Sequence, residues 1–391
     1  MVSRAAAEAP YRIDRDPLPV VVVYTHSLLE RSMTFIRSHS ESLDRYRPVY
    51  AGSHRVQGLE LPAERVFTAN SGGFSGKGRE YLFRRFGITG QLAVQLRKFR
   101  PSLVHAHFGQ SGPAGLAIAE SLGVPLIVTF HGQDATVSVD QSRRSWRGRE
   151  FLRGRQRVME RASLIIAVSD FIREKLLEQG YPEDRVVTHR NGIDTGSFSP
   201  TGRKREQVAV FVGRFVEKKG CEYLVRALGR LQADGTQLRG VLIGDGPLRP
   251  ALERLARDVG ADVEFTGFMQ PAEVRHWLER ACVAVVPSVT AADGNSEGLP
   301  TVILEAQAMG TPVIATRHAG NAEGLAEGRS ALLVDERDVE GLARSMRYFR
   351  DDKQAVESYG RAGREFVTDR FDIKTHVAGI ERIYDRVRKA S

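Results

Sequence analysis

Short apolar runs alternate with helical patterns along the chain, and this alternation limits the fold more than any other feature of the sequence. The first run, at 19–24, reads Pro-Val-Val-Val-Val-Tyr, which is typical of a strand buried on both faces. Runs of the same kind follow at 102–106, 125–129 and 163–168. Because strands that alternate with helices form parallel sheets, the pattern predicts an α/β unit.

The pattern starts again after a polar, turn-rich stretch at 191–206. The next strand is expected at 207–212. Further strands are expected at 239–243, 263–266, 283–287, 312–315 and 331–334. A chain of 391 residues is also too long for one ordinary core. We therefore predict two α/β domains with parallel sheets.

The domain limits follow from these patterns. Residues 1–17 show neither pattern, and we expect them to be disordered. The first domain is expected at 18–200 and the second at 201–370. The final segment, 371–391, contains an amphipathic helix with no strand after it, and we expect it to pack back on the first domain.

Cysteine usage and the N-terminus both favour a cytoplasmic protein. The two cysteines, Cys221 and Cys282, cannot form a disulfide framework and have no metal-ligand spacing. The N-terminus lacks the charged-then-apolar pattern of a signal peptide. Its longest apolar run, 18–24, is too short to span a bilayer.

The net charge of +9 lies almost entirely in the first half of the chain, where residues 1–200 hold 28 Lys and Arg against 20 Asp and Glu. Eight arginines fall within the stretch Arg143–Arg161. Such a basic amphipathic segment could rest on an anionic membrane surface. The alternatives are a solvated helix face and an arginine excess that follows from GC-rich coding. Aromatic residues make up only 8% and no nucleic-acid-binding motif occurs, so nucleic acid is not an expected partner.

The second domain opens with a strand that ends in Gly213-Arg214, and Lys219 follows five residues later. Open α/β sheets bind ligands at the carboxyl ends of their strands. Glycine lets a ligand approach the backbone closely, and the two cations could neutralise a diphosphate. A basic turn in solvent is the alternative interpretation.

Two further strands of this domain end in glycine, at Gly244 and at Gly267, which Phe268 follows. The backbone at Gly267 and Phe268 could face a flat base. Glycine-rich turns are also common connectors, so these two positions are weak signals by themselves.

The most informative segment of this domain runs from Glu297 to Glu305. Pro300 suits the first position of a helix, and the amides around it would form a phosphate site. A carboxylate at Glu305, within an apolar run, is costly unless it has polar partners. The two glutamates could therefore bind sugar and ribose hydroxyls, although a capped helix with a surface acid is the alternative.

In the first domain, His131 follows the strand at 125–129, and His105 and His107 end the preceding strand in the same way. A histidine at a strand's carboxyl end would face a second domain placed opposite it. A solvated or core histidine is the alternative, and the position at the strand end favours a functional role.

Taken together, these residues resemble family 4 of the glycosyltransferases, which has the two-domain GT-B fold. The elements that carry the resemblance are, in chain order, Phe130-His131-Gly132 with Asp134, Asn191-Gly192-Ile193-Asp194, Gly213-Arg214 with Lys219-Gly220, and Glu297 with Glu305. The resemblance covers about residues 18–390. It implies an α/β fold of two Rossmann-like domains around a central cleft, retention of anomeric configuration and no metal or other cofactor.

The resemblance also implies roles for individual residues. Arg214 and Lys219 would hold the diphosphate, Glu297 would bind donor sugar hydroxyls, and His131 would lie beside the sugar ring. Glu305 would bind the ribose. The further donor-binding positions are Gly213, Gly244, Gly267, Phe268, Gly298, Leu299, Pro300 and Thr301.

More narrowly, the stretches 30–36 and 290–300 resemble exopolysaccharide transferases of the colanic acid type. This favours a UDP-sugar over GDP-mannose as donor and a saccharide or lipid-linked acceptor. The loop after the first strand lacks the glycine-rich sequence of many family members. On the acceptor side we expect Ser32, Thr34, His107 and Asp134.

Other functions remain open on the sequence alone. A glycosyltransferase for a small natural-product acceptor would carry the same motifs. A sugar-nucleotide epimerase or a phosphorylase could use the same double fold, but the Arg214 and Lys219 pair with the two glutamates favours transfer. An inactive sugar-nucleotide sensor is disfavoured because the expected polar residues are all present.

Overall fold

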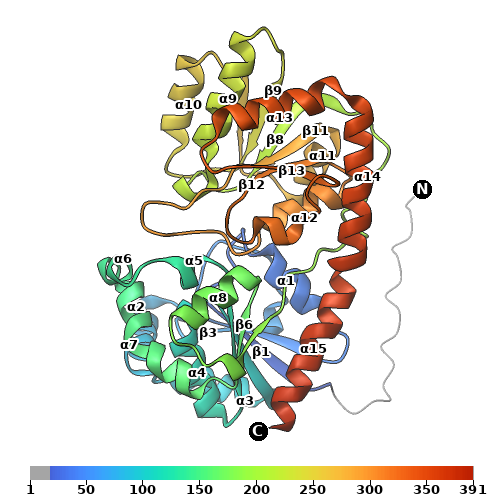
Figure 1. Ribbon diagram of the computed structural model, residues 1–391. Coiled ribbons are helices and arrows are strands. Elements are labelled where there is room, and N and C mark those ends of the chain that lie inside the picture. Colours follow the sequence, from blue (N-terminus) through green and yellow to red (C-terminus); the bar gives the residue numbers. More distant parts are fainter. Residues whose placement is uncertain (1–17, 391) are drawn as a thin grey trace, which may run out of the picture.

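The computed structural model describes residues 18–390, which form two domains, each built on a fully parallel sheet packed against helices (Figure 1). The predicted α/β fold class is confirmed. Residues 1–17, for which the sequence predicts disorder, lie outside the described residues, as does Ser391.

The N-terminal sheet has seven strands in the order β3-β2-β1-β4-β5-β6-β7. Their bounds are β1 Val20–Leu28, β2 Arg47–Arg55, β3 Val66–Thr68, β4 Pro101–His107, β5 Leu126–Phe130, β6 Leu164–Ala167 and β7 Val186–Thr188. All residues of β1 from Val20 to Tyr24 are buried, as its continuous apolar run predicts.

The C-terminal sheet has six strands in the order β10-β9-β8-β11-β12-β13. Their bounds are β8 Glu206–Val212, β9 Arg239–Ile243, β10 Val263–Gly267, β11 Ala281–Val286, β12 Val313–Thr316 and β13 Ala331–Val334. The sequence predicted all six strands, within two residues at each end.

Fifteen α-helices connect and cover the two sheets within the described residues. Those that follow strands β1 to β6 are α1 Thr34–Glu41, α2 Gly73–Phe86, α3 Gly90–Arg97, α4 Gly112–Leu122, α5 Gln133–Thr136, α6 Val139–Arg144, α7 Trp146–Arg161 and α8 Asp170–Glu178. The others are α9 Cys221–Ala233, α10 Arg249–Asp258, α11 Pro271–Arg280, α12 Thr301–Ala308, α13 Val339–Asp351, α14 Lys353–Arg370 and α15 Ile373–Lys389. Between residues 18 and 390, no helix has both the length and the apolar character needed to cross a membrane.

The chain crosses back to the first domain at its end, where α14 and α15 run down one side of the molecule (Figure 1). Ile380 and Tyr384 of α15 pack into the same apolar cluster as Val21 of β1. Glu381 accepts hydrogen bonds from the amides of Asp44 and Arg45, at 2.8 and 2.6 Å. The last helix is therefore anchored on the N-terminal domain by both apolar packing and a buried carboxylate.

The two domains also touch directly, through a carboxylate of the second domain. Glu323 accepts hydrogen bonds from the amides of Asp170 and Phe171, at 2.9 and 3.0 Å, and so caps α8 of the first domain. Arg190 lies 2.7 Å from the same carboxylate. A helix N-terminus favours an anion, so this contact stabilises the observed arrangement of the domains.

Candidate functional site

The loop after β5 and the loop before α12 meet between the two sheets. The amide of Ser296 donates to Thr136 Oγ1 at 3.0 Å, which joins the loops across the domains. Gly298 lies against the carbonyl oxygen of His131 so closely that a Cβ at Gly298 would collide with it. The carboxyl ends of both sheets therefore supply residues to one region.

Three predicted glycines come together at the carboxyl ends of β8, β9 and β10. The amide of Gly213 donates to the carbonyl of Ile243, and that of Gly244 donates to the carbonyl of Gly267, both at 2.9 Å. Gly244 has φ +138, and a Cβ there would collide with the Gly213 carbonyl oxygen. Glycine is therefore required where these strand ends approach each other.

The two predicted phosphate-binding cations lie beside these glycines but differ in their partners. Lys219 Nζ is 3.0 Å from Glu297 Oε1, and its neighbour Lys218 is 3.7 Å from Glu297 Oε2. The Arg214 side chain is exposed and forms no ion pair or hydrogen bond with another residue between 18 and 390. A guanidinium without a partner beside a paired lysine is suited to an anionic ligand.

The Glu297 carboxylate is buried, with 6% of the residue exposed. Burial alone would raise its pKa, but Lys219 and Lys218 outweigh this and lower the pKa to about 2. Glu297 is therefore ionised at neutral pH. Removing one lysine would leave a buried charge with less compensation.

His318 fixes the backbone at Glu297, although it belongs to no motif predicted from the sequence. Its Nε2 accepts a hydrogen bond from the Glu297 amide at 3.2 Å, and its Nδ1 lies 2.6 Å from Glu336 Oε1. His318 comes two residues after β12, so the strand-end argument used for His131 would also have found it.

The N-terminus of α12 presents unpaired amides. The helix begins at Thr301, and Pro300 precedes the first helical residue instead of occupying it as predicted. Among the described residues, the amides of Gly298, Leu299 and Thr301 have no acceptor. They form a potential phosphate site, as the sequence predicts.

Glu305 is half-buried on α12, one turn after Thr301. Burial raises its pKa to about 7, although a hydrogen bond with Thr301 and the charge of Lys219 partly oppose the rise. Glu305 therefore changes its charge near neutral pH, unlike Glu297.

In the first domain, Asp134 orients the loop that carries His131. Its buried carboxylate accepts hydrogen bonds from the amides of Gly109, His131 and Gly132, at 2.6, 3.0 and 2.8 Å. All of these bonds go to the backbone, so Asp134 positions this part of the chain. Its expected place on the acceptor side stays a prediction.

His131 and His107 share a hydrogen bond of 3.2 Å between His131 Nε2 and His107 Nδ1. Burial lowers the pKa of both, to about 3 for His107, so both rings are neutral at pH 7. His131 Nδ1 is buried and has no hydrogen-bond partner among the described residues. A neutral imidazole with one unused nitrogen is suited to a sugar hydroxyl.

Further histidines surround this pair, and no local pattern in the sequence points to most of them. A cavity of about 30 Å³ is lined by His39, His105, His107, His131 and His189. His105 bonds Tyr384 and Thr129, both at 2.7 Å, so it is a core histidine. His39 Nε2 lies 3.0 Å from the carbonyl oxygen of Gly192. The Asn191–Asp194 element therefore packs on the N-terminal domain where the chain passes to the second domain.

Thr34 is the first residue of α1, and Ser32 lies in the turn before it. Within residues 18–390, neither side chain forms a hydrogen bond with His131 or His107. Phe35 lies closer, with its ring centroid 5.1 Å from that of His131. Arg31, from the same segment, lies 5.3 Å above the ring of Phe268 in the second domain. The segment therefore lies near both domains, but through Phe35 and Arg31.

One group of residues between 18 and 390 has the composition of a metal site, namely His26, His54 and Glu80. Glu80 already bonds His54 Nδ1 and Asn70 Nδ2, both at 2.8 Å, and Arg84 lies 3.7 Å away. The guanidinium opposes a cation there.

The arginine-rich stretch covers the end of α6 and all of α7 on the surface of the N-terminal domain (Figure 1). Several of its arginines have partners; Arg157 and Arg161 both pair with Glu120, for example. Arg144, Arg147 and Arg153 are exposed and have no partner in the described chain.

Comparisons with known proteins agree with this arrangement. The family model "Glycosyltransferase Family 4" matches residues 49–197, and "Glycosyl transferases group 1" matches residues 206–352. WcaL of Escherichia coli, a glycosyltransferase named for colanic acid biosynthesis, is 33% identical over 263 residues, which are 64% of this chain and 61% of WcaL. AmsK of Erwinia amylovora, an amylovoran biosynthesis glycosyltransferase, is 28% identical over 256 residues, which cover 64% of this chain and 61% of AmsK. The matches thus span about three fifths of the length of these relatives.

Solved structures share the whole two-domain fold. Sucrose-phosphate synthase from Thermosynechococcus elongatus superposes with a TM-score of 0.77 at 20% identity, covering 95% of this chain and 100% of that one. HepE of Anabaena in complex with UDP gives a TM-score of 0.73 at 18% identity and covers 94% of this chain and 100% of HepE. These likenesses show the GT-B fold.

Proposed function

The chain belongs to the glycosyltransferases, with a family 4 domain followed by a group 1 domain, and from this premise we propose that it transfers a hexosyl group from a nucleoside diphosphate sugar to an acceptor hydroxyl. The observation that carries the proposal is the cluster at the carboxyl end of β8. There Lys219 pairs with buried Glu297 beside the unpartnered Arg214 and the free amides of α12. This combination suits a ligand with both negative charge and hydroxyl groups.

The diphosphate would lie between these cations and the N-terminus of α12. As the bond between sugar and phosphate breaks, negative charge grows on the leaving oxygen. Arg214, Lys219 and the amides at Gly298 and Leu299 stabilise that charge more in the transition state than in the ground state. We propose that these groups provide the charge compensation without a metal ion.

The sugar and nucleoside would be held by the remaining groups. Glu297, ionised at neutral pH, accepts hydrogen bonds from sugar hydroxyls, and neutral His131 binds a hydroxyl on the opposite side. Glu305 binds the ribose, and Gly267 with Phe268 faces the base. We favour UDP, since HepE, which has the same fold, was solved with UDP.

We further propose retention of the anomeric configuration, with attack from the face that the phosphate leaves. The acceptor would be a growing saccharide or a lipid-linked sugar in polysaccharide biosynthesis, because WcaL and AmsK are named for such pathways. Proton NMR of the product would show the anomer. An inverted product would contradict this part of the proposal.

A lipid-linked acceptor would bring the protein to a membrane, and the surface of α2 and α7 offers a contact for an anionic bilayer. Phe74, Tyr81 and Trp146 are exposed there, and Arg84 stacks on Trp146 at 3.8 Å, which joins the two helices. Exposed aromatic rings beside unpaired arginines suit an interface with anionic lipid.

Vesicle sedimentation tests this contact. Vesicles containing phosphatidylglycerol should bind the protein at low salt, and the triple variant Arg144→Gln, Arg147→Gln, Arg153→Gln should bind much less. The matched control changes three exposed arginines of the second domain, Arg226, Arg254 and Arg257, to Gln. Equal binding of the two triple variants would contradict the assigned surface.

The donor proposal is tested with a panel of nucleotide sugars, with and without EDTA, scoring binding and slow donor hydrolysis. We expect a UDP-sugar to be bound and turned over in EDTA, and turnover to be lost in Lys219→Ala. Lys353→Ala, which removes an exposed lysine at the start of α14, should behave as the unmodified protein. Failure of every sugar nucleotide to bind, or a strict need for a divalent ion, would contradict the proposal.

A further inference from the structure

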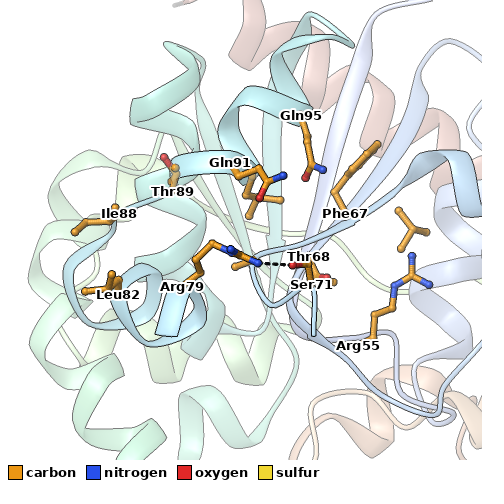
Figure 2. A pocket seen from close by; sticks show the side chains of 14 residues that line it. Arg55, Phe67, Thr68, Ser71, Arg79, Leu82, Ile88, Thr89, Gln91 and Gln95 are labelled. Atoms are coloured by element: carbon orange, nitrogen blue, oxygen red, sulfur yellow. Dashed lines mark hydrogen bonds between the residues drawn. The ribbon is translucent and has the colours of Figure 1, made fainter. Parts of the chain in front are cut away.

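A second cavity lies in the N-terminal domain, away from the predicted donor site. It has a volume of about 350 Å³ and lies among the end of β3, helix α2 and the start of α3 (Figure 2). Cavities of this size, within roughly 300–1,000 Å³, hold small molecules. In the sheet, β3 is four strands away from β5, the strand that leads to His131. Neighbouring strands lie about 4.8 Å apart, so the cavity is roughly 19 Å from His131.

The charge of the cavity is positive and uncompensated. Two of its lining residues, Arg55 and Arg79, are arginines, and none is acidic. Glu80, the next residue along α2, is already bonded to His54 and Asn70. The cavity therefore has no carboxylate of its own to balance the two guanidinium groups.

Both arginines have unused donors. Arg79 points across the cavity to Ser71, to which it donates one hydrogen bond, as Figure 2 shows. Its Nε is buried and has no acceptor among the described residues, which is costly for a charged group. Arg55 forms no ion pair or side-chain hydrogen bond within residues 18–390. A bound anion would satisfy both.

The remaining walls combine polar and apolar groups. The amides of Gly90 and Gln91 begin α3 and have no acceptor in the described part of the chain. Gln91 and Gln95 add side-chain amides, while Leu82 and Ile88 lie on the side of the cavity beyond Arg79 (Figure 2). Side-chain amides can bind hydroxyl groups, and an apolar wall can cover the ring face of a sugar.

From these observations we propose that the cavity binds a small anionic saccharide, a sugar that carries a phosphate or a carboxylate. Arg79 and Arg55 hold the anionic group, and Gln91 and Gln95 bind sugar hydroxyls. The proposal is independent of donor binding, because it concerns a different cavity and can be measured without a nucleotide sugar.

Isothermal titration with glucose 6-phosphate and glucuronate as probes, and with glucose as the uncharged control, tests the proposal. We expect the charged sugars to bind and glucose to bind at least about tenfold more weakly, since a hydrogen bond to a charged group contributes about 1.5–3 kcal/mol. Arg79→Gln and Arg55→Gln should each weaken the charged probes by about tenfold. Arg85→Gln, on the same helix but outside the cavity, should leave binding unchanged.

Two further comparisons separate the alternatives. Arg79→Lys keeps the charge but loses the forked geometry, so it should bind more tightly than Arg79→Gln and less tightly than the unmodified protein. If Arg79→Gln instead reduces binding to phosphatidylglycerol vesicles while neither charged sugar binds, the cavity holds a lipid headgroup and the saccharide proposal is wrong. Binding that is unchanged in both arginine variants, or that is lost in Lys219→Ala, would also overturn it.

Discussion

In each sheet the carboxyl ends of the strands form one edge. We call the edge with Glu297 and Lys219 in the C-terminal domain the charged edge, and the edge with His107 and His131 in the N-terminal domain the neutral edge. The polar groups of the two edges are stabilised in different ways. In the C-terminal domain, charge is balanced by charge, because Glu297 lies 3.0 Å from Lys219 while Arg214 has no partner between residues 18 and 390. In the N-terminal domain, His107 and His131 are neutral and bonded to each other. The first edge is suited to an anionic ligand and the second to hydroxyl groups, as we propose for the diphosphate and the sugar.

Replacing Lys219 should produce the largest effect, since it removes a cation from the charged edge. We expect Lys219→Ala to lose about 10²–10³ in kcat, because one electrostatic donor to the transition state typically contributes that much. Lys353→Ala is the matched control. Near-native turnover in Lys219→Ala would show that the charged edge does not perform the transfer.

The neutral edge is tested through Asp134, which holds the His131 loop by three backbone hydrogen bonds. Asp134→Asn replaces one carboxylate oxygen with an NH2 group, which cannot accept a hydrogen bond from these backbone amides. We therefore expect a loss of about 1–3 kcal/mol in the free energy of unfolding. Thermal melting would measure it. Asp140→Asn, at an exposed position of α6, should change stability little, and an equal loss in both variants would contradict the positioning role.

The two glutamates of the charged edge should respond differently to pH. Burial raises the pKa of Glu305 to about 7, so at pH 6 only about a tenth of it is ionised and able to accept from a ribose. We expect a UDP-sugar, whose diphosphate diester does not titrate in this range, to bind up to about tenfold more weakly at pH 6 than at pH 8. In titration calorimetry, the affinity of Glu305→Gln for the UDP-sugar should change little between pH 6 and pH 8. If its affinity changes with pH as much as that of the unmodified protein, another group causes the effect.

The raised pKa of Glu305 also makes the free energy of unfolding depend on pH. An acid whose folded pKa is raised binds more protons in the folded than in the unfolded state between about pH 4.5 and 7. This carboxyl therefore makes the free energy of unfolding fall as pH rises through that window. In urea unfolding, the free energy of unfolding of Glu305→Gln should fall less over this pH window than that of the unmodified protein. An identical fall would contradict the burial of the carboxyl.

The smallest expected effect concerns the contact that brings the two edges together. Glu323 of the second domain caps α8 of the first and pairs with Arg190. Glu323→Gln should weaken this contact between the domains, raise the radius of gyration in small-angle X-ray scattering and raise KM a few-fold. Glu327→Gln, at the exposed pair with Arg317, is the control. An unchanged radius in Glu323→Gln, or an equal change in both variants, would contradict the assigned contact.

The sequence predicted the charged edge better than the neutral one, and the reason lies in sequence distance. Gly213, Arg214 and Lys219 lie in the segment after β8, and Glu297 to Glu305 form one loop and helix, so short motifs contain most of the charged edge. The histidine cavity instead combines His39, His107 and His189, together with Tyr384 of the last helix. No local pattern could connect residues so far apart.

The fold shows the same limit. All strands with continuous apolar runs were predicted, whereas β2 was missed because Gly52 and His54 interrupt its pattern. β3 and β7 have three residues each, too few to show a period. In the segment where Ser32 and Thr34 are expected on the acceptor side, the ring of Phe35 packs against His131, a contact between distant residues that the sequence did not predict.

Hydrogen exchange of the backbone amides with and without UDP would test the central claim most directly, because amides that gain an acceptor exchange more slowly. We predict slower exchange at 297–302, where free amides begin α12, and at 212–220, with no change at 66–95 around the second cavity. Protection confined to the N-terminal domain, with 297–302 unaffected, would contradict the assignment of the charged edge as the donor site.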